Sequence, residues 1–529
     1  MTHAAPWMQD APSAELAAVV DYHQRSKHRP QRYAPSLGYL DWANQPNPFR
    51  HYTGAPRTPL RRNEPTAGAP PWFDDLYGAT TIATQAPDFD SISQLLFDAF
   101  ALSAWKRSGA SRWSLRCNPS SGNLHPTEVY LLLPDGPALY HYDPLEHALE
   151  QRLRLAPSAW ASLSAGLPPH SFLVGLSSIH WREAWKYGER AYRYCQHDLG
   201  HAMAQLAYAA AALGWQVREL PLADTALATL LGIDRAHAAE AESPGVLLRV
   251  SPPAPNDATV WQLPTALLDE LRCAELAGVA NRLSAENLPW DAIDQVAHAC
   301  LRAAAAPLPP RPAHPVATET SPRPIAARHI FRTRRSAVAM DGRTALPLAD
   351  FVRLMQRLTP SDTVPWNLQS WRPALHPLFF VHRVAGLAPG VYLLCREAQT
   401  LQRLRAALGR FSLEGNIAGV PATLSFYRLI AADVREFARL SNCGQEIAAD
   451  GAFSVAMLAE FDAPLRAYGA WMYRRLYWEA GMLGQVLYLE AEAAGLRGTG
   501  IGCFFDDTIH EALGLEDMQF QSLYGFTVG

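Results

Sequence analysis

Cysteine is scarce in this sequence, and its pattern excludes two kinds of site. The seven cysteines among 529 residues stand alone, with no Cys-x-x-Cys pair. A zinc knuckle or a closely spaced dithiol motif is therefore not predicted, and a disulfide-stapled scaffold is excluded. Unpaired cysteines fit a reducing compartment, so we expect a cytoplasmic protein.

An excess of charge of either sign is also absent. The chain has 46 basic and 50 acidic side chains, a formal net charge of −4, and no arginine-rich tract. Nucleic acid is therefore not an expected partner, because binding to a phosphate backbone depends on clustered positive charge.

Long hydrophobic runs are lacking as well. The N-terminal residues show neither the basic start nor the apolar run of a secretory signal. The most apolar stretch, residues 199–215, contains His201 and Gln205 and is shorter than the roughly 20 residues that cross a bilayer. The sequence predicts a buried helix here and no membrane partner.

Several common catalytic signatures are missing, namely GxxxxGK[ST], HExxH and GxSxG. The glycine-rich run 498–502 follows a predicted helix, whereas a dinucleotide fingerprint follows a strand. Its backbone N–H groups remain free to approach an anion closely. His197 and His201 have metal-ligand spacing, but no cysteine or carboxylate completes a ligand set, so no metal is predicted.

The length of the chain implies two or more domains. Seven prolines between residues 307 and 324 prevent both helix and strand there, which predicts an extended spacer. We expect a first domain at 1–305, with two extra helices at 264–303, a proline-rich linker at 306–325, and a second domain at 326–529.

The two predicted domains are related by an internal repeat. Residues 187–215 and 468–496 match at nine positions without a gap, at a constant offset of 281. The matches include Tyr187 with Tyr468, and apolar residues recur at helical spacing in both copies. Each half therefore contains one long helix rich in small residues.

Two further segments repeat in the same order. Residues 119–143 correspond to 370–395, since both hold Leu-His-Pro, an apolar run, a Gly/Pro turn and a second short run. This pattern predicts loop, strand, turn and strand. Residues 23–28 match 333–338 more loosely. Three repeated features indicate a tandem duplication.

These segments carry a resemblance to a known family. PSSGNLHPTE (119–128), KYGERAYRY (186–194) and RRS (334–336) resemble the nitroreductase-like flavoproteins, specifically the SagB-type dehydrogenase branch. Residues 27–52 look like the start of double-length members. The resemblance implies an FMN-dependent oxidoreductase of α+β fold: two tandem domains, each a mixed, mainly antiparallel sheet flanked by helices, forming a pseudo-dimer within one chain.

The resemblance also implies which residues hold FMN. In the family an Arg-x-Ser element and a glycine-rich segment of one subunit bind the phosphate, and a Pro-Ser-x-x-Asn loop of the other reaches the flavin ring. The corresponding residues here are Arg334, Arg335, Ser336, Gly500, Ile501 and Gly502 for the phosphate, and Pro119, Ser120, Ser121 and Asn123 for the ring.

Each half departs from the family pattern in a different segment. The first half has Gln24 at the arginine position and residues 217–219 in place of the glycines. The second half has residues 370–374 in place of the ring loop, with Pro373 unable to donate a hydrogen bond. We therefore predict one composite FMN site. The alternative interpretations are that Arg334 and Arg335 are solvated charges and that 119–123 is a generic turn.

Lys186 and Tyr187 are the catalytic candidates. The pair resembles the Lys-Tyr element with which SagB-type dehydrogenases oxidise azolines to azoles, a reaction that removes a proton from carbon. A lysine desolvated by Trp181 and Trp185 would serve as the base, with Tyr187 holding or relaying the proton. The alternative is a lysine that extends to solvent from the helix.

The expected substrate is an azoline-like ring in a peptide or small molecule, with a cyclodehydratase-type enzyme as a possible partner. Two other functions fit the sequence. One is an NAD(P)H-dependent reductase of nitroaromatics, quinones or enones. The other is a scaffold in which one or both halves have lost catalysis.

Overall fold

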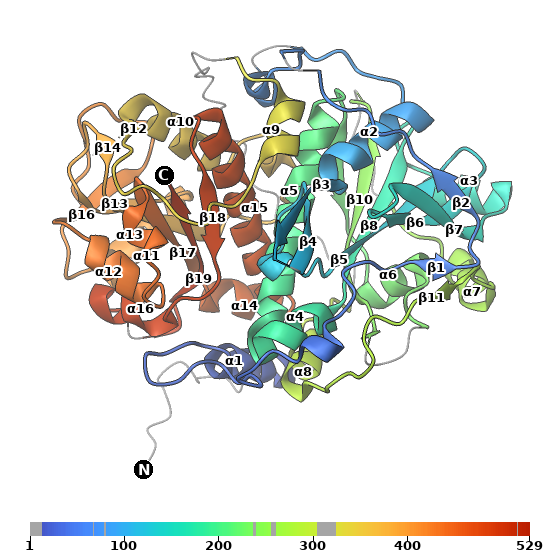
Figure 1. The fold of residues 1–529 in the computed structure, drawn as a ribbon, viewed down its shortest axis with the longest axis horizontal. Coiled ribbons are helices and arrows are strands. Elements are labelled where there is room, and N and C mark those ends of the chain that lie inside the picture. Colours follow the sequence, from blue (N-terminus) through green and yellow to red (C-terminus); the bar gives the residue numbers. More distant parts are fainter. Residues whose placement is uncertain are drawn as a thin grey trace.

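The computed structural model describes residues 13–66, 68–78, 81–109, 111–235, 240–254, 261–303, 324–515 and 517–529. Nearly all of the linker predicted at 306–325 lies outside these residues. The described chain forms two large antiparallel sheets on opposite sides of a central pair of helices (Figure 1).

The sheet of the first half has seven strands, and that of the second half has six. In spatial order the first consists of β2 (Arg57–Pro59), β7 (Ala148–Arg154), β6 (Ala138–Asp143), β5 (Thr127–Leu133), β8 (Phe172–Ser178), β10 (Ser243–Ser251) and β9 (Gln216–Leu220). The second consists of β16 (Phe426–Ala431), β15 (Gly390–Leu394), β13 (Leu375–Val381), β17 (Phe453–Glu460), β19 (Phe520–Val528) and β18 (Gly498–Ile501).

The two sheets repeat the same strand order. The order β6-β5-β8-β10-β9 in the first half corresponds to β15-β13-β17-β19-β18 in the second. Strand β17 lies at an offset of 281 from β8, the same offset as the sequence repeat. The α+β tandem architecture is therefore confirmed. Every pairing within the two large sheets is antiparallel, and the short ladder of β12 (Leu346–Pro347) with β14 (Val384–Ala385) is parallel.

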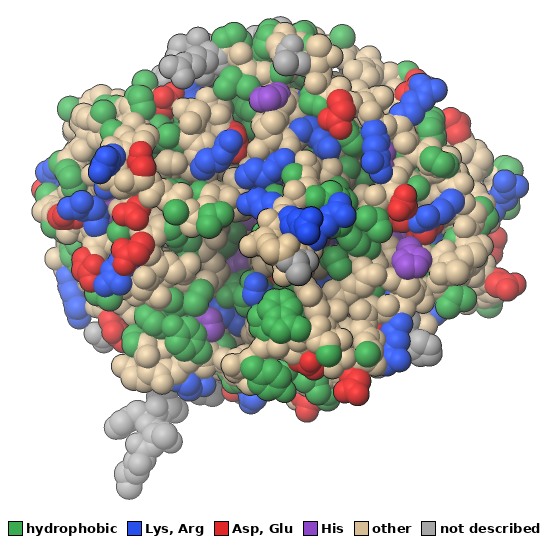
Figure 2. Space-filling view, in the orientation of Figure 1, with side chains coloured by type: hydrophobic (Ala, Val, Ile, Leu, Met, Phe, Trp, Pro, Cys, Tyr) green, Lys and Arg blue, Asp and Glu red, His purple; other side chains and the backbone are tan. Residues whose placement is uncertain are grey.

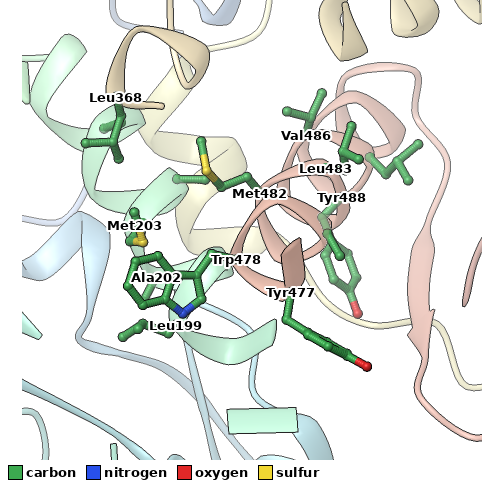
Figure 3. Packing of buried hydrophobic residues seen from close by; sticks show 14 of the residues in the cluster. Leu199, Ala202, Met203, Leu368, Tyr477, Trp478, Met482, Leu483, Val486 and Tyr488 are labelled. Carbon is green, nitrogen blue, oxygen red and sulfur yellow. The ribbon is translucent and has the colours of Figure 1, made fainter. Parts of the chain in front are cut away.

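The repeated helices are α5 (Ala191–Ala211) and α15 (Met472–Ala493), and they lie against each other between the sheets (Figure 1). Nearly every residue of both helices is buried, as predicted for residues 199–215. Side chains of Leu199, Ala202 and Met203 pack near Trp478 and Met482 across the crossing (Figure 3). One hydrophobic cluster therefore runs through both halves.

Two glycines allow the helices to meet. A Cβ added at Gly200 would lie 2.2 Å from the carbonyl oxygen of Trp478, and one at Gly481 would lie 2.2 Å from that of His197. Both contacts are with backbone, which cannot move aside as a side chain can. Gly200 and Gly481 are related by the offset of 281, so the repeat preserves the close approach in both copies.

The remaining elements surround this core. The other helices are α1 (Ala14–Arg25), α2 (Phe89–Ala99), α3 (Pro157–Ser164), α4 (His180–Tyr187), α6 (Asp224–Leu231), α7 (Thr265–Cys273), α8 (Asp291–Ala299), α9 (Ala327–Thr333), α10 (Leu348–Leu358), α11 (Ala398–Ala407), α12 (Arg435–Ser441), α13 (Ile447–Asp450), α14 (Asp462–Tyr468) and α16 (Asp506–Leu513). The other strands are β1 (Tyr52–Thr53), β11 (Val279–Ala280), β3 (Leu102–Ser108) and β4 (Ser111–Arg116). Helices α7 and α8 are the two predicted at 264–303.

The halves exchange their N-terminal segments. Helix α9 packs against α2 and α5 of the first half. The segment after α1 reaches the second half, where Lys27 Nζ lies 2.7 Å from Asp507 Oδ1 and the carbonyl of His28 accepts from the N–H of Asp506. The starting segment of each half therefore contacts the other half as well as its own, and the predicted domain boundary near residue 326 remains a prediction.

Among the helices of the described ranges, none combines the length and the apolar character that crossing a membrane requires.

We expect Gly200→Ala and Gly481→Ala each to lower the free energy of unfolding by about 1–3 kcal/mol or more, the usual cost of forced overpacking. Urea denaturation would measure the loss. Gly415→Ala is the matched control, because Gly415 is exposed and its added Cβ would meet only ordinary contacts, 3.5 Å from Tyr427. Equal stability of all three variants would contradict the tight crossing.

Candidate active site

A cavity of about 430 Å³ opens where the two halves meet. Its walls come from the first half (the β3–β4 hairpin, the loop 119–123, and helices α4 and α5) and from the second half (the segment after α9, helix α15 and strand β18). Most of the predicted site residues line it: Pro119, Ser120, Ser121, Asn123, Tyr187, Arg334, Ser336, Gly500, Ile501 and Gly502.

Helix α4 ends beside the loop 119–123 because Gly188 stops it. Gly188 has φ +54°, and a Cβ there would lie 2.3 Å from the carbonyl oxygen of Pro35. The last residues of the helix, Lys186 and Tyr187, consequently lie next to Gly122. A Cβ at Gly122 would be 2.6 Å from Tyr187 Oη and 3.1 Å from Lys186 Nζ. Lys186 and Tyr187 are thus in contact with the loop 119–123.

The loop 119–123 is held from below by Asp198 of α5. The carboxylate of Asp198 accepts hydrogen bonds from the backbone N–H of Ser121, at 3.0 Å, and from its hydroxyl, at 2.9 Å. The hydroxyl of Ser120 accepts from the N–H of His125 at 2.8 Å. The turn is therefore fixed by the helix that also makes the crossing between halves.

Asp198 is a buried acid, and the nearby positive charge of Arg116 offsets the effect of its burial only in part. Burial raises the pKa of Asp198 to about 7, against the lowering effect of its hydrogen bonds to Ser120 and Ser121. Burial, and next the charge of Asp198, raise the pKa of the neighbouring Glu183 well above its usual value. Both carboxyl groups therefore bind a proton more readily than free acids do, and Asp198 lies directly at the loop.

The second half presents hydrogen-bond donors to the cavity. Arg334 is buried, its Nε and Nη2 donate to the carbonyl oxygens of Cys117 and Arg116, and its Nη1 has no partner among the described residues. Ser336 Oγ lies 2.8 Å from the hydroxyl of Tyr488, which also accepts from the N–H of Gly500 at 3.0 Å. A buried, unpaired guanidinium N–H favours an anionic ligand.

Two glycines of the second half make room for tyrosine side chains of the cavity wall. A Cβ at Gly500 would lie 2.0 Å from the hydroxyl oxygen of Tyr524, and one at Gly502 would lie 2.4 Å from the ring of Tyr194. Backbone N–H groups and a guanidinium in a concave site are the donor set that suits a phosphate. These residues fit the phosphate end of FMN, and the loop 119–123 fits its ring.

Two predicted residues do not line the cavity. Arg335 turns away from it, and its guanidinium donates to the carbonyl oxygens of Arg332, Arg334 and Ser103. Lys186 does not line the cavity either, although its Nζ lies close to Gly122, which does.

The place that corresponds to the phosphate end in the other half is filled by the protein itself. Glu219 occupies the position equivalent to Gly500, and its carboxylate accepts from Arg475 at 2.9 Å and from the hydroxyl of Ser370. Burial, the largest effect, raises the pKa of Glu219, but the charge of Arg475 and the hydrogen bonds from Arg475 and Ser370 together outweigh burial and lower the pKa. The Arg475 guanidinium lies about 5 Å from the rings of Trp371 and Trp478.

Basic side chains surround the cavity on the outside. The β3–β4 hairpin carries Lys106, Arg107 and Arg112, and Lys and Arg side chains gather over it in the middle of the face shown in Figure 2. Lys106 also lines the cavity, together with buried Arg116. The charge around the entrance favours an anionic ligand.

Sequence reasoning did not single out Asp198, Glu183, Lys106, Tyr488 and Tyr524 as site residues. For Asp198 a signal existed, because it aligns with Glu479 at the repeat offset and Glu479 likewise accepts from the backbone N–H groups of Ala374 and Leu375. For the others no local signal existed, because tertiary packing alone brings Lys106, Tyr488 and Tyr524 to the cavity and Glu183 to Asp198.

Residues 391–529 match the Nitroreductase family. They include β18 and the glycines of the cavity, so the C-terminal part of the chain carries the family sequence. No curated protein sequence matches the chain.

The fold of the whole chain is similar to that of a solved nitroreductase-type structure. A protein of this type from Anabaena variabilis aligns with a TM-score of 0.67 and 21% identity, covering 97% of this chain and 99% of that one. One from Ralstonia eutropha aligns with a TM-score of 0.28 and 20% identity, covering 42% of this chain and 100% of that one. A chain of the E. coli microcin synthetase McbBCD complex aligns with a TM-score of 0.27 and 22% identity, covering 45% of this chain and 93% of that one. The first match shows a shared nitroreductase-type fold over the full length.

We expect Asp198→Asn to change the dependence of stability on pH. An aspartate has a pKa near 3.8 in the unfolded chain and about 7 here, so the stability that its retained proton contributes is lost as pH rises through 7. Asparagine cannot ionise, and the variant should lose less stability than the parent between about pH 5 and pH 8. Urea denaturation at both pH values would show this, and parallel changes in the two proteins would contradict it.

Proposed function

We propose that the protein is an FMN-dependent oxidoreductase with one composite cofactor site per chain. The observation that carries the proposal is the cavity between the halves, because it joins the loop 119–123 to Arg334 and to the backbone of Gly500 and Gly502. The family match of residues 391–529 supports the same function.

In this site, the second half would hold the phosphate. The unpaired Nη1 of Arg334 would donate to it, and the N–H of Gly500 would exchange its present acceptor, the Tyr488 hydroxyl, for a phosphate oxygen. The first half would hold the ring against Ser120–Asn123, a loop whose shape Asp198 maintains. When bound, FMN supplies the two-electron chemistry, and the protein orients it and excludes water.

Within this class we propose a SagB-type dehydrogenase that oxidises azoline-like rings. Lys186 and Tyr187 support this role because both reach the ring loop at Gly122. Burial, the largest effect, raises the pKa of Tyr187 well above its usual value, so its hydroxyl stays protonated and donates. Lys186 Nζ would take up the proton removed from the substrate carbon, with the Tyr187 hydroxyl positioning the ring.

Activity and binding assays distinguish this dehydrogenase from the two alternative functions, the reductase and the scaffold. An azoline-containing peptide should be oxidised while the flavin band is bleached in the absence of oxygen. Steady oxidation of NAD(P)H with a nitroaromatic or quinone acceptor, and none of the azoline, would support the reductase instead. Protein that does not take up FMN at all would favour the scaffold.

The stoichiometry of the cofactor tests the composite site. We expect one FMN per chain after reconstitution, because Glu219 and Arg475 fill the equivalent place in the other half. Arg334→Ala should weaken FMN binding by roughly 10- to 100-fold, the worth of one charge-assisted hydrogen bond. Arg335→Ala is the matched control and should bind as the parent does, since Arg335 turns away from the cavity. Flavin titration by fluorescence measures both.

A ratio of two FMN per chain would contradict a single site. If the Arg334→Ala and Arg335→Ala proteins bound FMN with equal affinity, Arg334 would not be a ligand of the phosphate. Thermal unfolding of the cofactor-free variants shows whether weaker binding results from the loss of a contact with FMN or from the loss of the fold.

Catalytic roles are tested by Lys186→Ala and Tyr187→Phe. We expect both to retain FMN and to lower the rate of azoline oxidation by about 100-fold or more, as for the loss of a general acid or base. Tyr468→Phe is the control, because Tyr468 holds the equivalent position in the second half and is 36% exposed. An unchanged rate in Lys186→Ala would make Lys186 a structural residue.

A further inference from the structure

Two cysteines far apart in the sequence meet beside the cavity. Cys443 follows α12, and Cys503 follows β18 and lines the cavity wall next to Gly502. Their sulfur atoms are 2.9 Å apart, and both side chains are partly exposed. The two sulfur atoms of a disulfide are about 2.05 Å apart, so a small further approach would allow the bond to form.

The backbone already holds these segments together without a sulfur bond. The N–H of Phe505 donates to the carbonyl oxygen of Ser441 at 2.8 Å, and the side-chain amide of Gln445 donates to the carbonyl oxygens of Cys503 and Asn442, each at 2.9 Å. Formation of a disulfide between Cys443 and Cys503 would therefore require little rearrangement of the backbone.

Cys503 lies in surroundings that favour its thiolate. The Nδ1 of His28 accepts from the N–H of Ala34 at 2.9 Å, which leaves its Nε2–H as the donor available to Cys503. The hydrogen bond between the two thiols, the largest effect, lowers the pKa of Cys503, and His28 and Arg190 lower it further. The same hydrogen bond raises the pKa of Cys443. Cys503 is thus the nucleophile and Cys443 the resolving thiol.

We propose that Cys443 and Cys503 form a redox-active pair that closes to a disulfide in the cavity wall when it meets a low-molecular-weight disulfide. The Cys503 thiolate attacks one sulfur of the small disulfide and releases one thiolate. Cys443 then attacks the Cys503 sulfur of the mixed disulfide, loses its proton and releases the second thiol. The pair is oxidised by two electrons, and the small disulfide is reduced to two thiols.

Oxidation changes the cavity wall that also contains Gly500 and Gly502. It replaces a thiolate by an uncharged disulfide and joins the end of β18 to the loop after α12. The significance of this change for FMN rests on the function proposed above, whereas the sulfur chemistry does not.

The test uses the full chain. The protein is reduced with dithiothreitol, the dithiothreitol is removed, and oxidised glutathione is then added. After blocking of free thiols and digestion with trypsin, we expect a linked pair of peptides, 440–466 with 498–529, that disappears on renewed reduction. Cys443→Ser should accumulate a glutathione adduct on Cys503, whereas Cys503→Ser should leave Cys443 unmodified. His28→Gln should form the linked peptides several-fold more slowly.

Exposed Cys273 is the internal control, since its modification shows that the reagent works. Modification of Cys273 without the linked peptides in the parent, or without an adduct on Cys503 in Cys443→Ser, would overturn the proposal. Mass spectrometry of peptides needs no bound flavin, so failure here and failure to bind FMN are separate results.

Discussion

The contact on which the rest of the structure depends is the crossing of α5 and α15 at Gly200 and Gly481. Because backbone meets backbone there, the two sheets are held at a fixed separation and orientation. Asp198 lies one half-turn before Gly200 and fixes the loop 119–123, while Tyr488 lies two turns after Gly481 and contacts Gly500. The same two helices therefore carry both ends of the cavity, one end from each half of the chain.

Polar contacts set the register of this crossing. Trp478 Nε1 donates to the amide oxygen of Gln196 at 2.8 Å, and Gln485 donates to Gln205 at 2.7 Å. A buried amide left without its partner costs about 1–3 kcal/mol, so a slip of the helices past each other would be unfavourable even where the apolar packing survived. The apolar side chains supply most of the burial, and the amides select one alignment.

The sequence was sufficient to predict the duplication, the α+β fold and ten of the residues that line the cavity, because the repeat and the motifs are local patterns. Three results were outside its reach. Arg335 was predicted beside Arg334, but adjacent residues after a helix point in different directions, and only the packing of α9 decides which faces the cavity. The carboxyl pair of Glu183 and Asp198 depends on two helices meeting. The proximity of Cys443 and Cys503, 60 residues apart, depends on the sheet edge at β18.

A covalent duplication explains why the two equivalent places differ. In a symmetric dimer of identical chains, a glutamate at the position of Gly500 would alter both sites at once. In one chain, Glu219 occupies that position in only one copy, where Arg475 neutralises it and tryptophans pack around the pair. The place equivalent to Gly500 in the first half is thus closed by a buried ion pair, and because the two copies are separate segments of one chain, the second half keeps glycine there.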